Sequence, residues 1–99
     1  MRYKIIAIIG EAGTGKDYIL SKLARRYRKY LNPIIQTTSR PKRENEIEGK
    51  SYYFITKQEF AHKIADNTML TVAQYRDWYY GTEIKSLDKN KVNIGVFNL

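Results

Sequence analysis

The segment that decides the predicted fold is Gly10-Glu11-Ala12-Gly13-Thr14-Gly15-Lys16-Asp17, which follows the apolar run Lys4-Ile5-Ile6-Ala7-Ile8-Ile9. Its spacing fits the pattern G-x-x-x-x-G-K. Glycines in this pattern let consecutive backbone N–H groups face one point, with a lysine beside them and the positive end of a helix dipole below. The segment is therefore predicted to be a loop that holds a polyphosphate.

The residues on either side of this loop support the prediction. The run 4–9 is continuous and β-branched, which favours a strand buried on both faces of a parallel sheet. An amphipathic helix is predicted after the loop, because apolar residues recur there at steps of three and four: Ile19, Leu20, Leu23, Ala24, Tyr27 and Leu31. The alternative is a glycine-rich turn that binds nothing, but such a turn has no use for a lysine at position 16.

Asp17 stands where the pattern usually has the serine or threonine whose hydroxyl ligates Mg²⁺. A carboxylate is also a hard oxygen ligand for Mg²⁺. Its charge repels the β-phosphate unless the ion or Lys16 screens it. Asp17 is therefore the candidate metal ligand.

The composition describes one globular domain of 99 residues, with 42% hydrophobic and 28% charged residues. No apolar stretch approaches the roughly 18 residues of a membrane span, and no signal-peptide pattern opens the chain. The chain has no cysteine, which excludes disulfides and thiolate metal sites, and His62 is interpreted as a solvated surface residue. A net charge of +8 favours anionic partners, either nucleotides or nucleic acids.

Basic residues gather in two places. Those of the first helix lie mainly off its apolar stripe and are interpreted as a solvated face, with a polynucleotide-binding ridge as the alternative: Lys22, Arg25, Arg26, Arg28 and Lys29. Arg40, Lys42 and Arg43 fall in a loop that contains a proline, where an anion site is the better interpretation.

The order of the remaining elements predicts an α/β fold. Asn32-Pro33 is expected to break the first helix before a strand at 34–38, a polar loop at 39–50 and a β-rich stretch at 51–55. Thr56 and Glu59 form a capping box for a helix to about residue 65. Extended segments at 69–75 and 78–80 and a brief helix from 82 or 83 to 87 precede a last strand at 91–97, expected beside the first.

The predicted fold class is a P-loop NTPase-type parallel sheet with helices and an inserted small mixed β/α segment. We expect one domain over residues 1–99, made of a P-loop unit (1–33), an inserted segment (34–82) and a return helix and strand (83–99) that ends with a Walker-B-like strand. Such sheets normally continue with further crossover units. Either a longer protein was cut, or another copy of the chain covers the exposed sheet edge as a homodimer.

Two further stretches resemble the guanylate kinase family. Residues 37–54, Thr-Thr-Ser-Arg-Pro-Lys-Arg-Glu-Asn-Glu-Ile-Glu-Gly-Lys-Ser-Tyr-Tyr-Phe, are similar to the family's T-T-R-x-P-R-x-G-E-x-x-G-x-D-Y-x-F, with one position redistributed around the proline. Ala73-Gln74-Tyr75 and Tyr79-Tyr80-Gly81-Thr82 look like its A-x-[FY] and Y-Y-G-[ST]. Together with the P-loop, three motifs occur in the family's order over nearly the whole chain.

The resemblance implies a site for the acceptor nucleoside monophosphate. The family's phosphate clamp of two arginines and two tyrosines corresponds to Arg40, Arg43, Tyr52 and Tyr80; without the arginines, the tyrosines would read as ordinary sheet aromatics. The base contacts correspond to Gln36, Thr71 and Thr82, and Thr71 replaces a glutamate. Asn98 aligns with an acidic residue near the metal and the acceptor. Residues 10–17 would bind ATP with Mg²⁺, and Lys16, Arg40 and Arg43 would be catalytic.

The activity implied is transfer of the ATP γ-phosphoryl group to GMP, dGMP or a related monophosphate, in the cytoplasm. The family's lid arginines belong to a C-terminal half that is absent here, so slow turnover or none is expected. The alternative is a non-catalytic binding module, as in membrane-associated scaffold proteins whose related domain binds phosphopeptides; Asp17, Thr71 and Asn98 favour it. A nucleic-acid binder is a third interpretation, but no stacking motif supports it.

Overall fold

The computed structural model describes residues 3–10 and 15–98, and the side chains of Lys16, Asp17 and Asn98 are outside that description. The chain divides into two compact units, one formed by Met1–Ile34 with Leu87–Leu99 and the other by Ile35–Ser86. Each unit has its own sheet.

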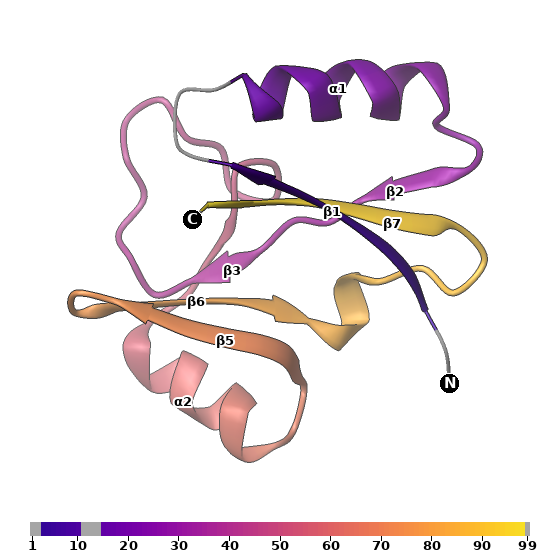
Figure 1. Ribbon diagram of the computed structural model, residues 1–99. Helices are drawn as coiled ribbons and strands as arrows, with labels where there is room; N and C mark the ends of the chain where they lie inside the picture. Colours follow the sequence, from indigo (N-terminus) through magenta and orange to yellow (C-terminus); the bar gives the residue numbers. More distant parts are fainter. Residues whose placement is uncertain (1–2, 11–14, 99) are drawn as a thin grey trace. The chain divides into compact units, whose positions relative to one another are not determined.

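The first unit is a parallel sheet with one helix packed on it. Its elements are β1 (Lys4–Gly10), α1 (Lys16–Arg26), β2 (Leu31–Pro33) and β7 (Val92–Asn98). The strand order is β1-β7-β2, and both pairings are parallel (Figure 1). Ile94 of the central strand is 2% exposed, and Ile34 is also buried. The predicted α/β class and the pairing of the last strand with the first are confirmed.

The burial predicted for β1 is wrong for this structure. Ile5, Ile6 and Ile9 are 44%, 50% and 62% exposed. The cause is topological, because β1 is the end strand of its sheet and α1 is the one helix of this unit within residues 3–10 and 15–98. An apolar run is typical of a strand whose two faces are covered by helices, but the run alone does not show whether those helices are present.

The first helix ends earlier than its apolar spacing predicts. The amide of Tyr27 donates to the Leu23 carbonyl (2.9 Å), and those of Tyr30 and Leu31 donate to the Tyr27 carbonyl (2.8 and 3.0 Å), which closes a turn. Leu31 pairs with Val92 and belongs to β2, not to the helix. Pairing with β7 satisfies the backbone hydrogen bonds of this segment in an extended conformation. The residue before Pro33 also favours an extended conformation.

The strand predicted at 34–38 is also divided differently. The Ile34 amide donates to the Ile94 carbonyl (2.8 Å) at the end of β2. The chain then leaves this sheet and becomes extended again at β3 (Thr37–Thr38), in the second unit. One predicted strand is therefore two short strands in different sheets.

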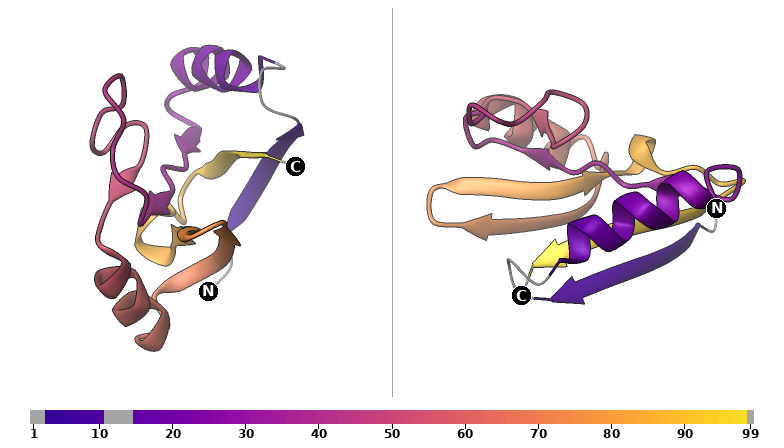
Figure 2. Two further views of the ribbon diagram at one scale, coloured as in Figure 1. Left: turned by 90° about the vertical axis from the view of Figure 1, so that its left-hand side faces the viewer. Right: turned by 90° about the horizontal axis from the view of Figure 1, so that it is seen from above.

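The second unit is a four-stranded mixed sheet with order β4-β3-β6-β5. After β3 come the loop 39–50, β4 (Tyr53–Phe54), α2 (Lys57–Ala65), β5 (Met69–Tyr75), β6 (Trp78–Glu83) and the 3₁₀ turn η1 (Ile84–Ser86). β5 and β6 form a long antiparallel hairpin, clearest in the right-hand view of Figure 2. The β-rich stretch predicted at 51–55 is a strand at only two residues, and the brief helix begins after Glu83.

The start of α2 is the best-predicted local feature. The Glu59 amide donates to Thr56 Oγ1 and the Thr56 amide donates to Glu59 Oε1, both at 3.0 Å, as a capping box requires. Phe60 of this helix is fully buried and stacks on Tyr79, with ring centroids 5.6 Å apart. A Cβ on Gly81 would lie 3.3 Å from Phe60 Cζ, so position 81 faces α2. Because strand residues alternate, Tyr80 and Thr82 face the opposite side of the sheet.

Candidate functional site

The start of α1 has the local form of an anion site. Gly15 caps the helix with a left-handed backbone (φ 83°), and no side chain within the described ranges makes the capping hydrogen bond. Among the residues that the structure describes, none lies within 4 Å of the position that a Cβ on Gly15 would occupy. The first amides of an uncapped helix seek an acceptor and carry the positive end of the dipole, so this terminus fits a phosphate group.

Some of the residues predicted to bind ATP lie at or near this helix terminus. Lys16 and Asp17 open α1, and Gly10 closes β1. The predictions for Glu11, Ala12, Gly13 and Thr14 lie outside the described residues. Gly10 pairs with Asn98, so the backbones of these two predicted site residues are neighbours where two parallel strands end. In open α/β sheets ligands bind beyond the carboxyl ends of the strands.

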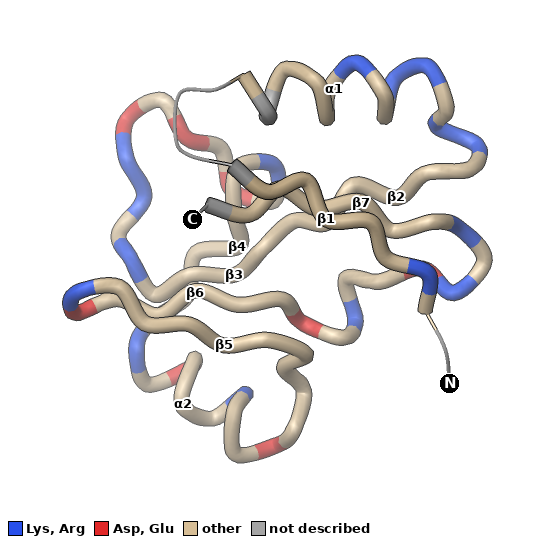
Figure 3. Tube along the Cα trace, in the orientation of Figure 1, with Lys and Arg blue, Asp and Glu red and all other residues tan. Residues whose placement is uncertain are grey.

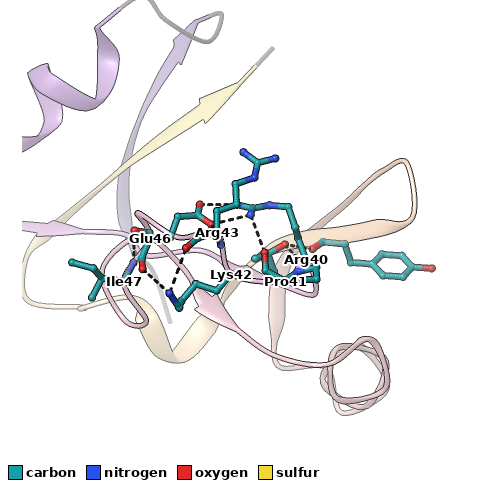
Figure 4. Close-up of polar contacts among 9 residues, drawn as sticks. Arg40, Pro41, Lys42, Arg43, Glu46 and Ile47 are labelled. Atoms are coloured by element: carbon teal, nitrogen blue, oxygen red, sulfur yellow. Dashed lines mark hydrogen bonds and ion pairs between the residues drawn. The ribbon is translucent and has the colours of Figure 1, made fainter.

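Arg40 is a buried arginine held by one carboxylate. It is 8% exposed, and its Nη1 and Nη2 donate to Glu46 Oε1 (2.9 Å) and Oε2 (2.7 Å), as Figure 4 shows. Nη1 also donates to the Pro41 carbonyl (3.1 Å). The hydrogen bonds from Arg40 lower the pKa of Glu46 to about 2, and those to Glu46 raise the pKa of Arg40 above its usual value. Both groups stay charged at neutral pH.

Aromatic rings surround the same guanidinium. Its carbon lies 5.4 Å from the ring centroid of Tyr52 and 6.0 Å from that of Phe54. Tyr52 and Tyr80 meet edge to face at 6.0 Å, and burial raises the pKa of the Tyr52 phenol. Tyr80 in turn helps to raise the pKa of Arg40. Arg40, Tyr52 and Tyr80, three of the four predicted clamp residues, therefore lie together.

Arg43, the fourth predicted clamp residue, joins this cluster through its backbone. Its amide donates to Glu46 Oε1 (2.8 Å), and its carbonyl accepts from the Glu46 amide (3.1 Å). The Arg43 residue itself is exposed. Glu46 thus fixes both ends of the segment 40–43.

Sequence reasoning missed Glu46 as a site residue. The loop 39–50 contains three glutamates among its basic residues, Glu44, Glu46 and Glu48, and their order along the chain does not show which of them pairs with Arg40. A helical or strand period cannot reveal such a pairing, since the loop has neither. The bidentate geometry becomes visible only once the loop is folded.

Two of the three residues predicted to contact the base, Thr71 and Thr82, lie at the β5–β6 pairing, whereas Gln36 precedes β3. Thr71 pairs with Thr82, beside an irregularity in β5 between Met69 and Thr71. The Thr82 amide donates to Thr71 Oγ1 (3.1 Å). Thr82 is 1% exposed, and its Oγ1 has no hydrogen-bond partner within the described part of the chain. A buried hydroxyl without a partner is costly, which fits a group that hydrogen-bonds a ligand. The Gln36 carbonyl accepts from the Tyr53 amide (2.9 Å).

Glu83 is a buried carboxylate with structural partners. Thr37 Oγ1 donates to its Oε2 (2.5 Å), and Lys63 Nζ of α2 lies 2.8 Å from its Oε1. Burial acts to raise the pKa of Glu83, but the contacts with Lys63 and Thr37 outweigh it and lower the pKa. Glu83 therefore ties α2 to the sheet.

Other observations bear on metals, membranes and polyanions. Over residues 3–10 and 15–98, no three histidine or acidic side chains group as a metal site. The same residues contain no helix long and apolar enough to cross a bilayer.

The basic residues of the first helix region are exposed. Lys22, Arg25 and Arg26 lie on α1, whereas Arg28 and Lys29 lie in the turn after it, not in the helix as predicted (Figure 3). His62 is exposed, as predicted.

Comparisons with known proteins agree on one family. The family model described as guanylate kinase matches residues 2–94. A guanylate kinase of Mycoplasmoides gallisepticum is 44% identical over 91 residues, which cover 88% of this chain and 47% of that protein. MAGUK p55 subfamily member 7 of Danio rerio is 35% identical over 92% of this chain, but over only 16% of that protein.

A solved structure extends this likeness to the fold. The crystal structure of guanylate kinase from Anaplasma phagocytophilum matches with a TM-score of 0.66 at 21% identity, over all of this chain and 50% of that one. The chain thus spans about half the length of the guanylate kinases that it matches.

Proposed function

Because this chain belongs to the guanylate kinase family, we propose that it is a nucleoside monophosphate kinase that transfers the γ-phosphoryl group of ATP to GMP, dGMP or a related acceptor. The observation that carries the proposal is the buried Arg40, packed against Tyr52 and held by Glu46. A surface arginine would not need so many partners. A rigid guanidinium beside phenols is suited to a phosphate monoester.

The acceptor phosphate would bind at the N–H groups of Arg40 that do not contact Glu46 or Pro41. Arg40 makes three hydrogen bonds to Glu46 and Pro41, whereas a guanidinium has five N–H donors. The phenols of Tyr52 and Tyr80 add donors without adding charge, and the exposed Arg43 can supply a second guanidinium. In this proposal Glu46 is a positioning residue, because it acts on the phosphate through Arg40.

The donor would bind at the start of α1. The amides of residues 10–17 and the ammonium of Lys16 would hold the β- and γ-phosphates of ATP. Asp17 would hold Mg²⁺, which neutralises phosphate charge when bound. An oxygen of the acceptor phosphate attacks the γ-phosphorus while its bond to the bridging oxygen breaks, and ADP leaves. Such a reaction depends on positioning and electrostatics, not on a covalent intermediate.

A non-catalytic binding module is the second candidate. The likeness to MAGUK p55 subfamily member 7 favours it. The module would keep the Arg40 site and would have no need of a donor site. Within residues 3–10 and 15–98 no side chain caps α1, which follows Gly15, and this argues for the kinase, since a helix without a ligand is better capped by a side chain.

Two measurements separate the candidates. Thermal shifts with ATP–Mg²⁺ and with GMP, offered separately, should both be positive for a kinase, whereas a module responds to the monophosphate alone. A coupled assay of ADP release should then show stimulation by at least one ribo- or deoxyribonucleoside monophosphate. We expect that rate to be low, and to fall further in Arg40→Ala but not in Arg28→Ala, a matched change at an exposed arginine. Failure of ATP to bind would refute the kinase.

We also propose a cytoplasmic location, which rests on the nucleotide substrates.

A further inference from the structure

The positive charge of the chain is concentrated in one of its two units. Ten of the 18 lysines and arginines, but only three of the 10 aspartates and glutamates, belong to the unit of β1 and β7. In the other unit Arg40, Lys63 and Lys85 each form an ion pair with a glutamate. Among the residues that the structure describes, no cation of the first unit forms such a pair. Its charge is therefore not neutralised within the described part of the fold.

Part of this charge gathers where α1 ends and β7 begins. Lys91 Nζ donates to the Arg28 carbonyl (3.1 Å), and the Val92 amide donates to the Tyr30 carbonyl (2.8 Å). These bonds hold the turn after α1 beside the segment that precedes β7, and Figure 3 shows basic residues in both. Asp88 is the one acidic residue of the two segments, and its carboxylate accepts a backbone amide of its own segment.

The stability of α1 explains only some of these cations. Arg25 and Arg26 lie in its last turn, where a positive charge interacts favourably with the negative end of the helix dipole. Lys29 and Lys89 lie outside the helix, and both are exposed. Since the effect of the dipole is confined to the last turn, it does not account for these two lysines.

Two exposed tyrosines accompany the lysines. Tyr27 and Tyr30 are 43% and 68% exposed, and the guanidinium carbon of Arg26 lies 5.7 Å from the ring centroid of Tyr27. No stacking motif is visible in the sequence, because the apolar spacing places Tyr27 in the helix, which ends at Arg26. Rings exposed among cations are suited to single-stranded nucleic acid, whose bases stack on aromatic side chains while its phosphates contact lysine and arginine. The side chains concerned are called the Tyr–Lys surface below: Tyr27, Lys29, Tyr30, Lys89 and Lys91.

We propose that the Tyr–Lys surface binds single-stranded nucleic acid, with bases stacked on Tyr27 and Tyr30 and phosphates held by the lysines. This surface lies at the C-terminal end of α1, whereas Gly15 and Lys16, which are proposed to bind ATP, lie at the N-terminal end. The 11 residues of the helix separate its two ends by about 15 Å. The nucleic acid therefore binds apart from the proposed ATP site.

An anionic membrane fits the Tyr–Lys surface less well. Proteins that lie on a membrane insert apolar side chains between the lipid headgroups, in addition to presenting cations. Residues 26–30 and 88–91 include no aliphatic, phenylalanine or tryptophan side chain that could be inserted. Tyrosine rings beside lysines instead match the stacking platforms that hold successive bases of a single strand.

The test measures the fluorescence anisotropy of labelled oligonucleotides mixed with the purified chain. The probes are oligo(U) and oligo(dT) of about 12 nucleotides and an abasic deoxyribose-phosphate strand of the same length. At least one of the two oligonucleotides should bind about fivefold or more tightly than the abasic strand, because only bases can stack. Saturating ATP–Mg²⁺ or GMP should not displace it, since the Tyr–Lys surface is separate from the proposed nucleotide sites.

A change of one tyrosine tests the stacking. Tyr30→Ala should weaken binding of the oligonucleotide about fivefold or more and should leave binding of the abasic strand unchanged. Tyr75→Ala is the matched control, because Tyr75 is 62% exposed on β5, and it should change neither affinity.

A change of two lysines tests the phosphate contacts. Lys29→Gln combined with Lys89→Gln should reduce the slope of the logarithm of the binding constant against the logarithm of the salt concentration by about 1. Lys50→Gln combined with Lys57→Gln removes the same charge at two exposed lysines of the other unit and should leave the slope unchanged.

Four results would overturn the proposal: equal affinity for the oligonucleotides and the abasic strand, equal losses in Tyr30→Ala and Tyr75→Ala, displacement of the oligonucleotide by ATP or GMP, or tighter binding to phosphatidylserine vesicles than to the oligonucleotides. Three of these are measured on the unmodified chain, so the test stays valid if a variant does not fold. Binding of ATP and GMP is measured separately by thermal shift, so failure here is distinct from failure of the kinase proposal.

Discussion

At the scale of single residues, Glu46 is the group on which the proposed acceptor site depends. Its pKa is lowered from 4.5 to about 2 by its contacts with Arg40, so its contribution to stability is present above about pH 4.5 and is lost as the pH falls towards 2. Glu46→Gln should therefore lower the free energy of unfolding by about 1 to 2 kcal/mol at pH 7, and by less at pH 3. Urea unfolding at the two pH values measures this difference.

Glu44→Gln is the control for that change, because Glu44 is an exposed carboxylate of the same loop. It should have little effect at either pH. If the cost of Glu46→Gln were the same at pH 3 as at pH 7, the ion pair with Arg40 would not be its cause.

A second prediction at this scale concerns Thr71 and the preference for one base over another. A hydroxyl that already accepts from the Thr82 amide cannot hold both N–H groups of guanine, as a carboxylate would. We expect GMP and IMP, which lacks the exocyclic amino group, to bind this chain with affinities within about threefold of each other. Thr71→Glu should make the preference for GMP about tenfold or more. Calorimetry with both nucleotides measures the ratio, and an unchanged ratio would remove Thr71 from the base site.

At the scale of elements, α2 depends on its first turn. Thr56→Ala removes the side-chain acceptor of the capping box and should lower the free energy of unfolding by about 1 kcal/mol. Gln58→Ala, at an exposed position in the same turn, should change it by less than about 0.5 kcal/mol. Chemical denaturation of both variants gives the comparison. Equal losses would mean that helix propensity, not the cap, is being measured.

Sequence predicted those elements whose signals are local. The capping box of Thr56 and Glu59 and the strand before Gly10 each need only neighbouring residues, and both were predicted correctly. Leu31 was placed wrongly because its helical spacing is a local signal, whereas its pairing with Val92 joins residues far apart in the chain. The exposure of Ile6 and Ile9 could not be predicted from an apolar run, because burial depends on which other segments are present.

The candidate site shows the same difference between local signals, which the sequence displays, and contacts that exist only in the folded chain. The resemblance to guanylate kinases implied that Arg40, Tyr52 and Tyr80 belong to one phosphate clamp, and the structure brings these three side chains together. Glu46 escaped prediction because its bidentate contact depends on the folded loop. Thr71 and Thr82 became a pair only through the register of β5 and β6.

At the scale of the whole molecule, the residues proposed to bind the donor phosphates belong to one compact unit and those proposed to bind the acceptor phosphate belong to the other. Gly15 and Lys16 belong to the unit of β1 and β7, whereas Arg40 and Tyr52 belong to Ile35–Ser86. A phosphoryl group can pass between the two nucleotides only if both units engage them at the same time. That simultaneous engagement is the central claim.

The most direct test is calorimetry with a linked dinucleoside polyphosphate, in which adenosine and guanosine are joined through five phosphates. Since linking makes the second contact intramolecular, this ligand should bind about 100-fold more tightly than ATP or GMP alone, and both Lys16→Ala and Arg40→Ala should remove the gain. Arg28→Ala should retain it. Affinity no greater than that of the better single nucleotide would show that the two sites are not engaged together, and would contradict the account.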